Sequence, residues 1–293
     1  MAGVSAALAV LWFSPDGERT LGHELVDPAA PLLSALDLSA TRGDGIFESI
    51  SVGDGHPQAL EAHLARFARS AAMLDLPAPD AGAWRAAIVA VAGAIDPVPE
   101  SFVKIVLTRG IEGGGVPSGW AYATASPDAS AARTRGIHVV MLDRGVRHDV
   151  AQTSPWLLAG AKTLSYAVNR AAVREAARRG ADDVVFVSSD GYLLEGPTAN
   201  VVLLRDGRLL TPPLDAGILP GTTQADLFDW APTRRLEPVY ELLRPQDLLD
   251  ADAAWLVSSV RHAAPIRAVD HAEVPVDREL SDAMNAFLRG RTG

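Results

Sequence analysis

The sequence holds two lysines, Lys104 and Lys162, and its other cationic side chains are almost all arginines. A neutral lysine amine is a nucleophile that forms a Schiff base with a carbonyl compound. Lys162 has apolar neighbours, Leu157-Leu158-Ala159 before it and Leu164 after it. An amine in such surroundings loses hydration, which favours its neutral form. Lys162 is therefore the candidate for amine chemistry, and a surface lysine at a loop edge is the alternative.

Two further features downstream of Lys162 could hold a charged ligand. Glu195 stands between a predicted strand and a Gly-Pro step. The run Gly221-Thr222-Thr223 opens a predicted helix, where free N–H groups and the positive end of the helix dipole favour an anion. Simple N-capping by Thr222 is the alternative for that run.

An amine, a carboxylate and an anion site are together what pyridoxal phosphate requires. Its aldehyde needs a lysine, and its phosphate needs oriented N–H groups. Its pyridine nitrogen needs an acidic partner to stay protonated, so that the ring can act as an electron sink. Lys162, Glu195 and the Thr222-Thr223 turn supply these groups in one half of the chain. The combination predicts a pyridoxal phosphate site.

The periodicity of apolar residues predicts the elements that position these groups. A helix over residues 60–74 places His63 and Arg66 on one face, because they are three residues apart. A helix over 165–179 follows Lys162, and a strand over 183–188 leads toward Glu195. Gly43 and Gly45 flank Asp44 and permit a tight approach of the backbone before a strand that begins near Ile46. Further helices are expected over residues 81–94, 222–230 and 278–288, and further strands over 7–13, 18–21, 102–108, 120–125, 137–142, 200–204, 208–211 and 254–258.

Composition restricts the class of protein. Apolar residues make up 48% of the 293 residues, enough for a sizeable core. The net charge of −10 disfavours binding of nucleic acid or of an anionic membrane. The absence of cysteine excludes disulfides and thiolate chemistry, and no apolar run approaches the ~20 residues that span a bilayer. We therefore expect a cytoplasmic protein with no nucleic-acid or membrane partner.

Residues 126–134 are the best candidate for a linker, because they are rich in Ser, Pro, Asp and Ala and lack an apolar period. The expected organisation is a smaller N-terminal α/β domain over residues 1–125, this linker, and a larger C-terminal domain over 135–293 that carries Lys162.

The sequence resembles the class IV aminotransferase fold type of pyridoxal phosphate enzymes over nearly its whole length. That group contains branched-chain and D-amino-acid aminotransferases and 4-amino-4-deoxychorismate lyase. The matching segments are Gly43–Glu48, His63–Arg66, Lys162–Tyr166, Leu194–Asn200 and Leu219–Thr223. The resemblance implies a two-domain α/β (α+β) fold of fold type IV, D-amino-acid aminotransferase-like, with pyridoxal 5′-phosphate as cofactor. It also implies a homodimer whose active site lies near the domain interface and is completed by the partner chain.

The resemblance also implies roles for individual residues. Lys162 would bind the cofactor covalently and then move the proton, and Glu195 would pair with the pyridine nitrogen. The phosphate would be held by Arg66, Thr222 and Thr223, with Ser259 as a further contact and Tyr166 on the ring hydroxyl. Val260 departs from the family pattern, because a phosphate-binding threonine is common there.

Within the family, the segments around Lys162 and Arg109 are most similar to aminodeoxychorismate lyase, which forms 4-aminobenzoate and pyruvate. A substrate with two carboxylates needs cations, and Arg109, Arg42 and Arg261 are the candidates, since arginine binds a carboxylate through two nitrogens. Surface salt bridges are the alternative for each arginine.

Two features keep a transaminase open as the alternative to the lyase. Lyases often carry a further arginine in the glycine-rich loop, where this chain has only Gly113-Gly114-Gly115. Glu48, a further candidate for substrate binding, also occurs in D-amino-acid aminotransferases. A catalytically silent protein that keeps the fold for binding is the alternative from another class.

Overall fold

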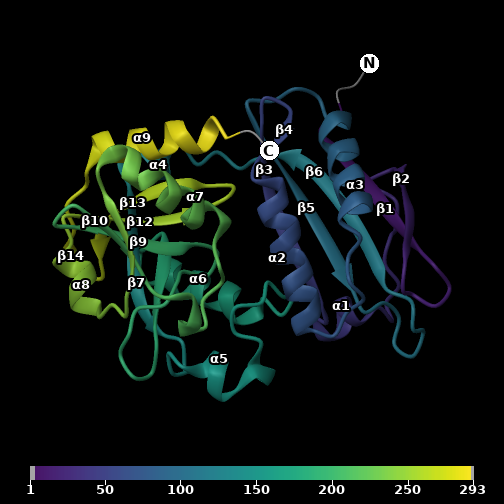
Figure 1. The fold of residues 1–293 in the computed structure, drawn as a ribbon, viewed down its shortest axis with the longest axis horizontal. Helices are drawn as coiled ribbons and strands as arrows, with labels where there is room; N and C mark the ends of the chain where they lie inside the picture. Colours follow the sequence, from purple (N-terminus) through teal and green to yellow (C-terminus); the bar gives the residue numbers. More distant parts are fainter. Residues whose placement is uncertain (1–3, 292–293) are drawn as a thin grey trace. The chain divides into compact units, whose positions relative to one another are not determined.

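The computed structural model describes residues 4–291, in which the chain forms two units, each with its own sheet (Figure 1). The first unit contains residues 4–127, 161–166 and 290–291. The second contains residues 128–160 and 167–289. The segment that carries Lys162 thus belongs by its contacts to the first unit, although the chain on both sides of it belongs to the second.

The sheet of the first unit has six strands in the described part of the chain, and every pairing in it is antiparallel. In spatial order the strands are β2 (Thr20–Val26), β1 (Ala6–Phe13), β6 (Ser118–Ala125), β5 (Glu100–Thr108), β3 (Gly45–Gly53) and β4 (His56–Pro57). Strand β3, which lies between β5 and the short edge strand β4, alternates its side chains between two faces, so Ile46, Glu48 and Ile50 point to the same side. All three are fully buried.

Two long helices, α2 (Leu60–Met73) and α3 (Ala81–Ala94), pack against this sheet. Asp80 caps α3 by accepting from the N–H of Ala83. The rings of Phe67 and Trp84 join the two helices edge to face, with centroids 4.9 Å apart, and both are fully buried. A short helix, α1 (Leu38–Arg42), precedes β3 and is capped by the buried Asp37.

The second unit contains a mixed eight-stranded sheet, as far as residues 4–291 show. Its strands, in spatial order, are β11 (Glu237–Tyr240), β10 (Arg208–Thr211), β9 (Asn200–Arg205), β12 (Ala253–Ser258), β13 (His262–Val269), β7 (Ile137–Asp143) and β8 (Asp183–Val187), with β14 (Ala272–Glu273) on β13. The pairs β10–β11, β13–β7 and β7–β8 are parallel, and the others are antiparallel.

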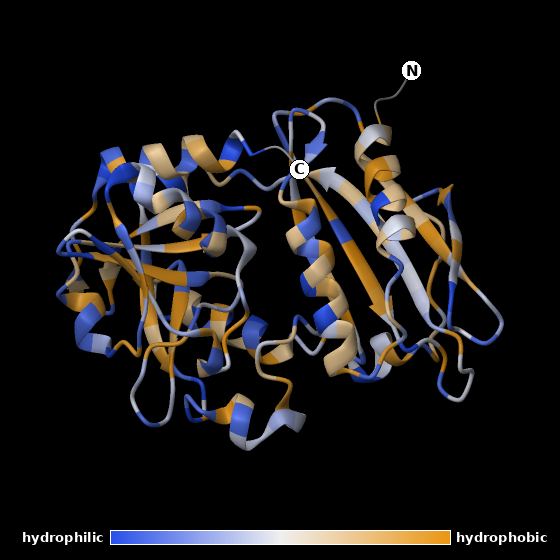
Figure 2. Cartoon of the chain, viewed as in Figure 1, coloured by the Kyte–Doolittle hydropathy of each residue, from blue (hydrophilic) through white to orange (hydrophobic). Residues whose placement is uncertain are grey.

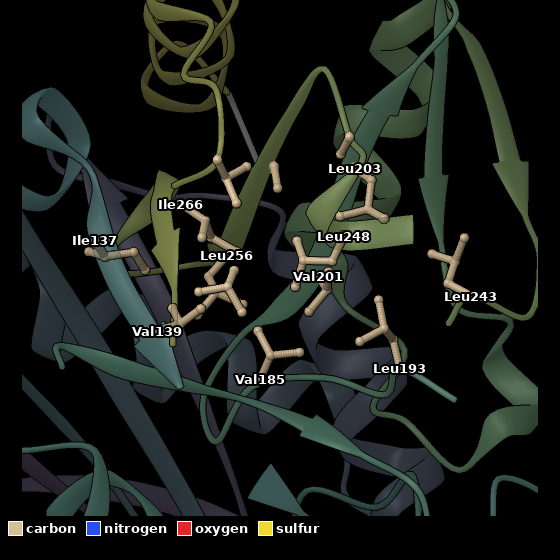
Figure 3. Packing of buried hydrophobic residues seen from close by; sticks show 14 of the residues in the cluster. Ile137, Val139, Val185, Leu193, Val201, Leu203, Leu243, Leu248, Leu256 and Ile266 are labelled. Carbon is tan, nitrogen blue, oxygen red and sulfur yellow. The ribbon is translucent and has the colours of Figure 1, made fainter. Parts of the chain in front are cut away.

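Both faces of this sheet are covered, which explains the continuous apolar runs of β9 and β12. Val202 and Trp255 face a cluster with the helices α7 and α9, whereas Val201, Leu203 and Leu256 face the opposite cluster. Figure 3 shows this opposite cluster, in which side chains of β7, β8 and β13 meet those of β9 and β12.

The helices of the second unit surround its sheet. They are α4 (Ser130–Arg135), α5 (Val150–Thr153), α6 (Ala167–Arg178), α7 (Thr222–Trp230), α8 (Pro245–Leu249) and α9 (Arg278–Arg289), with 3₁₀ turns η1 (Pro155–Leu157), η2 (Leu214–Ala216) and η3 (Ala231–Arg234). Hydrophobic and hydrophilic residues alternate along α2 and α9, as expected for helices that bury one face (Figure 2).

The predicted helices over residues 60–74, 81–94, 222–230 and 278–288 are confirmed within a residue of their ends. The helix after Lys162 begins at Ala167 rather than Ser165. Residues 126–134, expected as a linker, contain most of helix α4, which packs on β13. Strand β13 was not predicted, because its sequence contains Pro265 and follows a polar turn. No helix among residues 4–291 is long and apolar enough to cross a membrane.

Candidate active site

The backbone around Lys162 is held on two sides within the first unit. The N–H of Phe47 donates to the carbonyl oxygen of Lys162 at 3.0 Å, and the N–H of Leu164 donates to the carbonyl oxygen of Gly45 at 2.8 Å. These bonds add the lysine segment to an edge of β3 in antiparallel fashion. The N–H of Lys162 itself donates to the hydroxyl of Ser70 on α2 at 3.2 Å. The lysine therefore starts from a fixed main chain.

The two glycines of the Gly-Asp-Gly motif allow this segment to approach. A Cβ on Gly45 would lie 2.8 Å from the side chain of Leu164 and 2.8 Å from the carbonyl oxygen of Leu107. Gly43 has φ of +68°, and a Cβ there would lie 3.0 Å from the hydroxyl of Ser165. The predicted close approach of backbone at these glycines is confirmed.

The side chain of Lys162 is half-buried and lies over an aromatic ring. Its Nζ is 4.6 Å from the centroid of the Phe47 ring, and the ring of Tyr166 meets Phe47 edge to face with centroids 5.5 Å apart. The face of an aromatic ring attracts a cation. The ring of Phe47 thus provides a position for the protonated amine of Lys162. The sequence pattern did not indicate this contact.

Three charged or titratable side chains form a buried cluster beside this segment. Glu48 is fully buried, and its Oε1 and Oε2 accept from Nε and Nη2 of Arg66, each at 2.7 Å. Nδ1 of His63 lies 2.8 Å from Oε2 of Glu48. The exposed fraction is 0% for His63 and 5% for Arg66, so the shared helix face predicted for these two residues is a buried face.

Electrostatics define the charge states in this cluster. Burial by itself would raise the pKa of the Glu48 carboxyl, but Arg66 and then His63 hold that pKa well below its usual range. The pKa of His63 is lowered, chiefly because burial disfavours the charged imidazolium; Glu48 opposes this effect, and Arg66 and Lys162 add to it. At neutral pH the cluster thus contains an anionic Glu48, a cationic Arg66 and a neutral His63 that donates its Nδ1–H to Glu48.

The first unit also holds two of the candidate arginines. Nε of Arg109 donates to Asp44 at 2.7 Å, and its Nη2 donates to the carbonyl oxygen of Leu74 at 2.5 Å. The Arg109 side chain remains 40% exposed. Arg42 is the last residue of α1 and is exposed.

In the second unit, Glu195 is held by the segment that leads into α7. Its Oε2 accepts from the N–H of Leu219 at 3.1 Å and from Nδ2 of Asn200 at 3.4 Å. The same Nδ2 donates to the carbonyl oxygen of Leu219 at 2.8 Å. The main chain of Glu195 pairs with Phe186 of β8, where its carbonyl oxygen accepts at 2.9 Å. Asn200 therefore connects the carboxylate with the approach to the helix.

The N-terminus of α7 collects hydroxyl groups. Gly221 is the N-cap and no side chain caps the helix, so Thr222 is the first helical residue and not its cap. The hydroxyls of Thr222 and Thr223 lie 3.5 Å and 3.4 Å from the hydroxyl of Ser259, and both threonines are buried. A Cβ on Gly221 would lie 1.9 Å from Oδ1 of Asn200, so only glycine fits. Hydroxyls beside uncapped N–H groups are the donors that bind an oxyanion.

Arg261 follows the turn after β12 and pairs with Asp183. Its Nη1 donates to Oδ2 of Asp183 at 2.6 Å, while its Nε and Nη2 are buried and have no hydrogen-bond partner among residues 4–291. Val260 lies in the same turn, beside Ser259, and offers no side-chain hydroxyl.

The predicted site residues thus stand in two groups. Lys162, Tyr166, Arg66 and Glu48 belong to the first unit, together with the arginines 42 and 109. Glu195, Thr222, Thr223, Ser259 and Arg261 belong to the second. The sequence reasoning missed Ser70, Phe47 and Asn200 as neighbours of the functional groups. For Asn200 a signal existed, because an amide at the start of an apolar strand is unusual unless it has partners.

The donor set fits the chemistry of pyridoxal phosphate. It offers one amine on a fixed main chain, one carboxylate held by two N–H donors, and hydroxyls at a helix N-terminus. The described residues contain no cluster of three or more histidine, aspartate or glutamate side chains that could hold a metal ion.

Comparison with known proteins identifies the class to which this fold and site belong. Residues 45–269 match the family model described as amino-transferase class IV. The chain belongs to the class IV aminotransferase family. Its fold is that of the fold type IV enzymes, and its cofactor is pyridoxal 5′-phosphate.

Relatives and solved structures span nearly the whole chain. A bifunctional aminodeoxychorismate lyase / D-amino acid transaminase of Mycobacterium tuberculosis is 45% identical over 87% of this chain and 92% of its own. The fold IV transaminase CpuTA1 from Curtobacterium pusillum has 56% identity and a TM-score of 0.93, with 97% of each chain covered. The PLP-bound form of a hypothetical aminotransferase from Mycobacterium tuberculosis has 40% identity and a TM-score of 0.86, again with 97% of each chain covered.

Proposed function

We propose that this protein is an aminodeoxychorismate lyase, which converts 4-amino-4-deoxychorismate to 4-aminobenzoate and pyruvate. The observation that carries the proposal is the 45% identity, over 87% of the chain, to a relative whose name includes this activity. A lyase from Vibrio harveyi, 26% identical over 82% of the chain, adds support.

In this proposal Lys162 binds the aldehyde of the cofactor, and Glu195 pairs with its ring nitrogen. Thr222, Thr223 and Ser259 hold the phosphate together with Arg66, and Tyr166 contacts the ring hydroxyl. The proposal is supported by the hydroxyls at a helix start that no side chain caps, and by the carboxylate of Glu195, which accepts from Asn200 and from the N–H of Leu219 and is held in one direction by them.

The bound cofactor supplies a sink for the electron pair left behind when a proton leaves the substrate carbon next to nitrogen. The substrate amine would first displace Lys162 from the cofactor. The freed, neutral Nζ of Lys162 would then take up that proton, because it stays beside the carbon from which it was displaced. In the lyase reaction the carbon–oxygen bond between the ring and the enolpyruvyl group would then break. That group would leave and take up a proton as pyruvate, and the substrate ring would become aromatic, so no second substrate is required. Phe47 provides a place for the protonated amine, 4.6 Å from its ring centroid.

Transamination of D-amino acids, or of branched-chain amino acids, is the second candidate. It is favoured by the 56% identity to a fold IV transaminase and by the bifunctional name of the mycobacterial relative. In a transaminase Lys162 would return the proton, and water would release the substrate as a keto acid while its amino group stays on the cofactor. Both reactions use the same lysine for the first proton transfer.

We further propose Arg109, Arg42 and Arg261 as the cations that meet substrate carboxylates. Arg42 is exposed, whereas Arg109 and Arg261 each already bind one acidic side chain. Arg109 would donate to a substrate carboxylate through one of the two N–H groups of Nη1, whereas its Nε and Nη2 already bind Asp44 and the carbonyl oxygen of Leu74.

The first test replaces each of the two lysines. Lys162→Ala is expected to abolish turnover and the visible absorbance of the bound cofactor, while the matched Lys104→Ala variant keeps both. Borohydride reduction followed by peptide mapping is expected to place the cofactor on the Lys162 peptide. Full activity in Lys162→Ala, or a wild-type protein that binds no cofactor, would contradict the proposal.

The second test separates the two reactions. The purified enzyme is incubated with D-alanine or a branched-chain amino acid, without a keto acid, and its absorbance is followed. Conversion to the pyridoxamine form indicates a transaminase. Release of pyruvate from aminodeoxychorismate indicates the lyase, and both results together indicate a bifunctional enzyme.

We also propose a homodimer, on the basis of the family resemblance. Light scattering coupled to size-exclusion chromatography is expected to give twice the chain mass of 30.8 kDa. A monomer that is fully active would contradict the dimer.

A further inference from the structure

Glu48 is a carboxylate that no step of the proposed reaction uses. It is fully buried on β3, and both of its oxygens are occupied by Arg66 and His63. A carboxylate with two occupied oxygens and no exposed surface has nothing to offer a substrate. Its contacts instead act on Arg66, which the proposed function assigns to the cofactor phosphate.

The geometry of the pair determines how Arg66 is presented. Glu48 binds the Nε–Nη2 edge of the guanidinium side-on, at 2.7 Å for each contact. This bidentate contact fixes the plane of the guanidinium and leaves Nη1 on the side away from Glu48. An arginine side chain otherwise has large rotational freedom. A guanidinium whose plane is already fixed therefore loses less conformational entropy when an anion binds to it.

His63 completes the arrangement by holding Glu48. It lies three residues before Arg66 on α2. Its Nδ1 is 2.8 Å from Oε2 of Glu48 and 3.4 Å from Nη2 of Arg66. One helix turn therefore supplies both groups that hold the Glu48 carboxylate in place.

We propose that Glu48 is a positioning residue that orients Arg66 toward the phosphate of the cofactor, and that it does not bind substrate. This inference rests on the proposed function, because it takes Arg66 as a phosphate ligand. It assigns the selectivity for a phosphorylated cofactor to the whole cluster and not to Arg66 alone.

The test compares two ligands that differ only in the phosphate. Affinities of the cofactor-free protein for pyridoxal phosphate and for pyridoxal are measured by absorbance titration, for wild type, Arg66→Gln and Glu48→Gln. We expect Arg66→Gln to lose about 10-fold to 100-fold in affinity for pyridoxal phosphate, the range for a hydrogen bond to a charged group. Glu48→Gln is expected to lose about 10-fold. The affinity for pyridoxal is expected to stay within about twofold of wild type in both variants, because pyridoxal has no phosphate for Arg66 to bind.

A matched control is available on the same helix. Glu61 binds Arg85 through two nitrogens with the same kind of geometry, but both side chains are exposed. Glu61→Gln is expected to leave both affinities unchanged. If Glu48→Gln does not fold, Glu48→Asp serves in its place, since its shorter side chain keeps the charge and draws the guanidinium back from its position.

The outcomes are distinct. A loss of affinity for pyridoxal phosphate alone in the Glu48 variant supports the positioning role. Equal loss for both ligands, or loss for neither while Arg66→Gln behaves as expected, overturns it and leaves the proposed function intact. A wild-type protein that binds neither ligand overturns the proposed function itself.

Discussion

Arg66 is bound through two nitrogens to a buried carboxylate, whereas Thr222 and Thr223 have hydroxyls 3.5 Å and 3.4 Å from Ser259. Both groups are proposed to hold one phosphate. The first depends on charge that must be balanced inside the protein, because a buried ion alone is costly. The second depends on the shape of the main chain at Gly221. Removing a charge should therefore weaken phosphate binding by Arg66, whereas adding a single carbon atom at Gly221 should weaken phosphate binding by the threonines.

The largest effect is expected from Gly221→Ala. The new Cβ would lie 1.9 Å from Oδ1 of Asn200, so the amide that holds Glu195 and Leu219 must move. We expect a destabilisation of about 1–3 kcal/mol and a loss of cofactor affinity of about 100-fold. Thermal unfolding and absorbance titration measure these effects.

Gly93→Ala is the matched control for this substitution. Gly93 lies inside α3 with nothing within 4 Å of an added Cβ, so alanine should stabilise the helix by up to about 1 kcal/mol. Normal cofactor binding in Gly221→Ala would show that the turn adapts and that shape does not govern this group.

A smaller effect is expected from Thr223→Val. The contact of this hydroxyl with Ser259 is long, at 3.4 Å, so its loss should change the free energy of unfolding by less than about 1 kcal/mol. Cofactor affinity should fall about tenfold, because a donor to a charged phosphate is lost. Thr233→Val, which removes the exposed hydroxyl that donates to Trp230, should leave affinity unchanged. Equal affinities of the two variants would argue against a phosphate contact at Thr223.

A pH dependence of stability is expected from the charged group and not from the hydroxyl group. The pKa of buried His63 is lowered from its usual 6.5, so below that pH the unfolded chain binds a proton that the folded chain resists. Stability should therefore fall as the pH drops below about 6.5, by up to ~1.4 kcal/mol per pH unit. The contribution of Glu48, whose pKa is lowered, persists to lower pH and is lost only below about 4.3.

Urea unfolding between pH 5 and 8 measures the contribution of His63. In His63→Asn the amide can take the place of Nδ1, and the fall in stability toward pH 5 should become shallower than in wild type. His56→Asn is the control, since His56 is exposed. An unchanged slope in His63→Asn would mean that His63 titrates normally in the folded chain.

Much of this arrangement was accessible from sequence because it is local. The apolar periods of α2, α3 and α9 predicted three helices, and the glycines 43 and 45 predicted the close approach that the Lys162 segment makes. Glu195 and Thr222 could be singled out because each sits where a predicted element begins or ends.

The contacts that could not be predicted are those between distant segments. The pairing of Phe47 with Lys162, the bond from Lys162 to Ser70 and the reach of Asn200 to Leu219 depend on tertiary packing. Glu48 is a partial exception. It alternates with Ile46 and Ile50, which a period of two places on the buried face, but nothing in that pattern identifies Arg66 as its counter-ion.

The addition of the Lys162 segment to β3 also has a consequence for synthesis of the chain. Ser165 meets Gly43 across 122 residues of sequence. At ribosomal rates of about 5–20 residues per second, the N-terminal part of β3 waits about 6–24 s before its neighbour exists. An unpaired strand edge is a template for other chains. Nascent chains that stall before residue 161 should therefore be the aggregation-prone form of this protein.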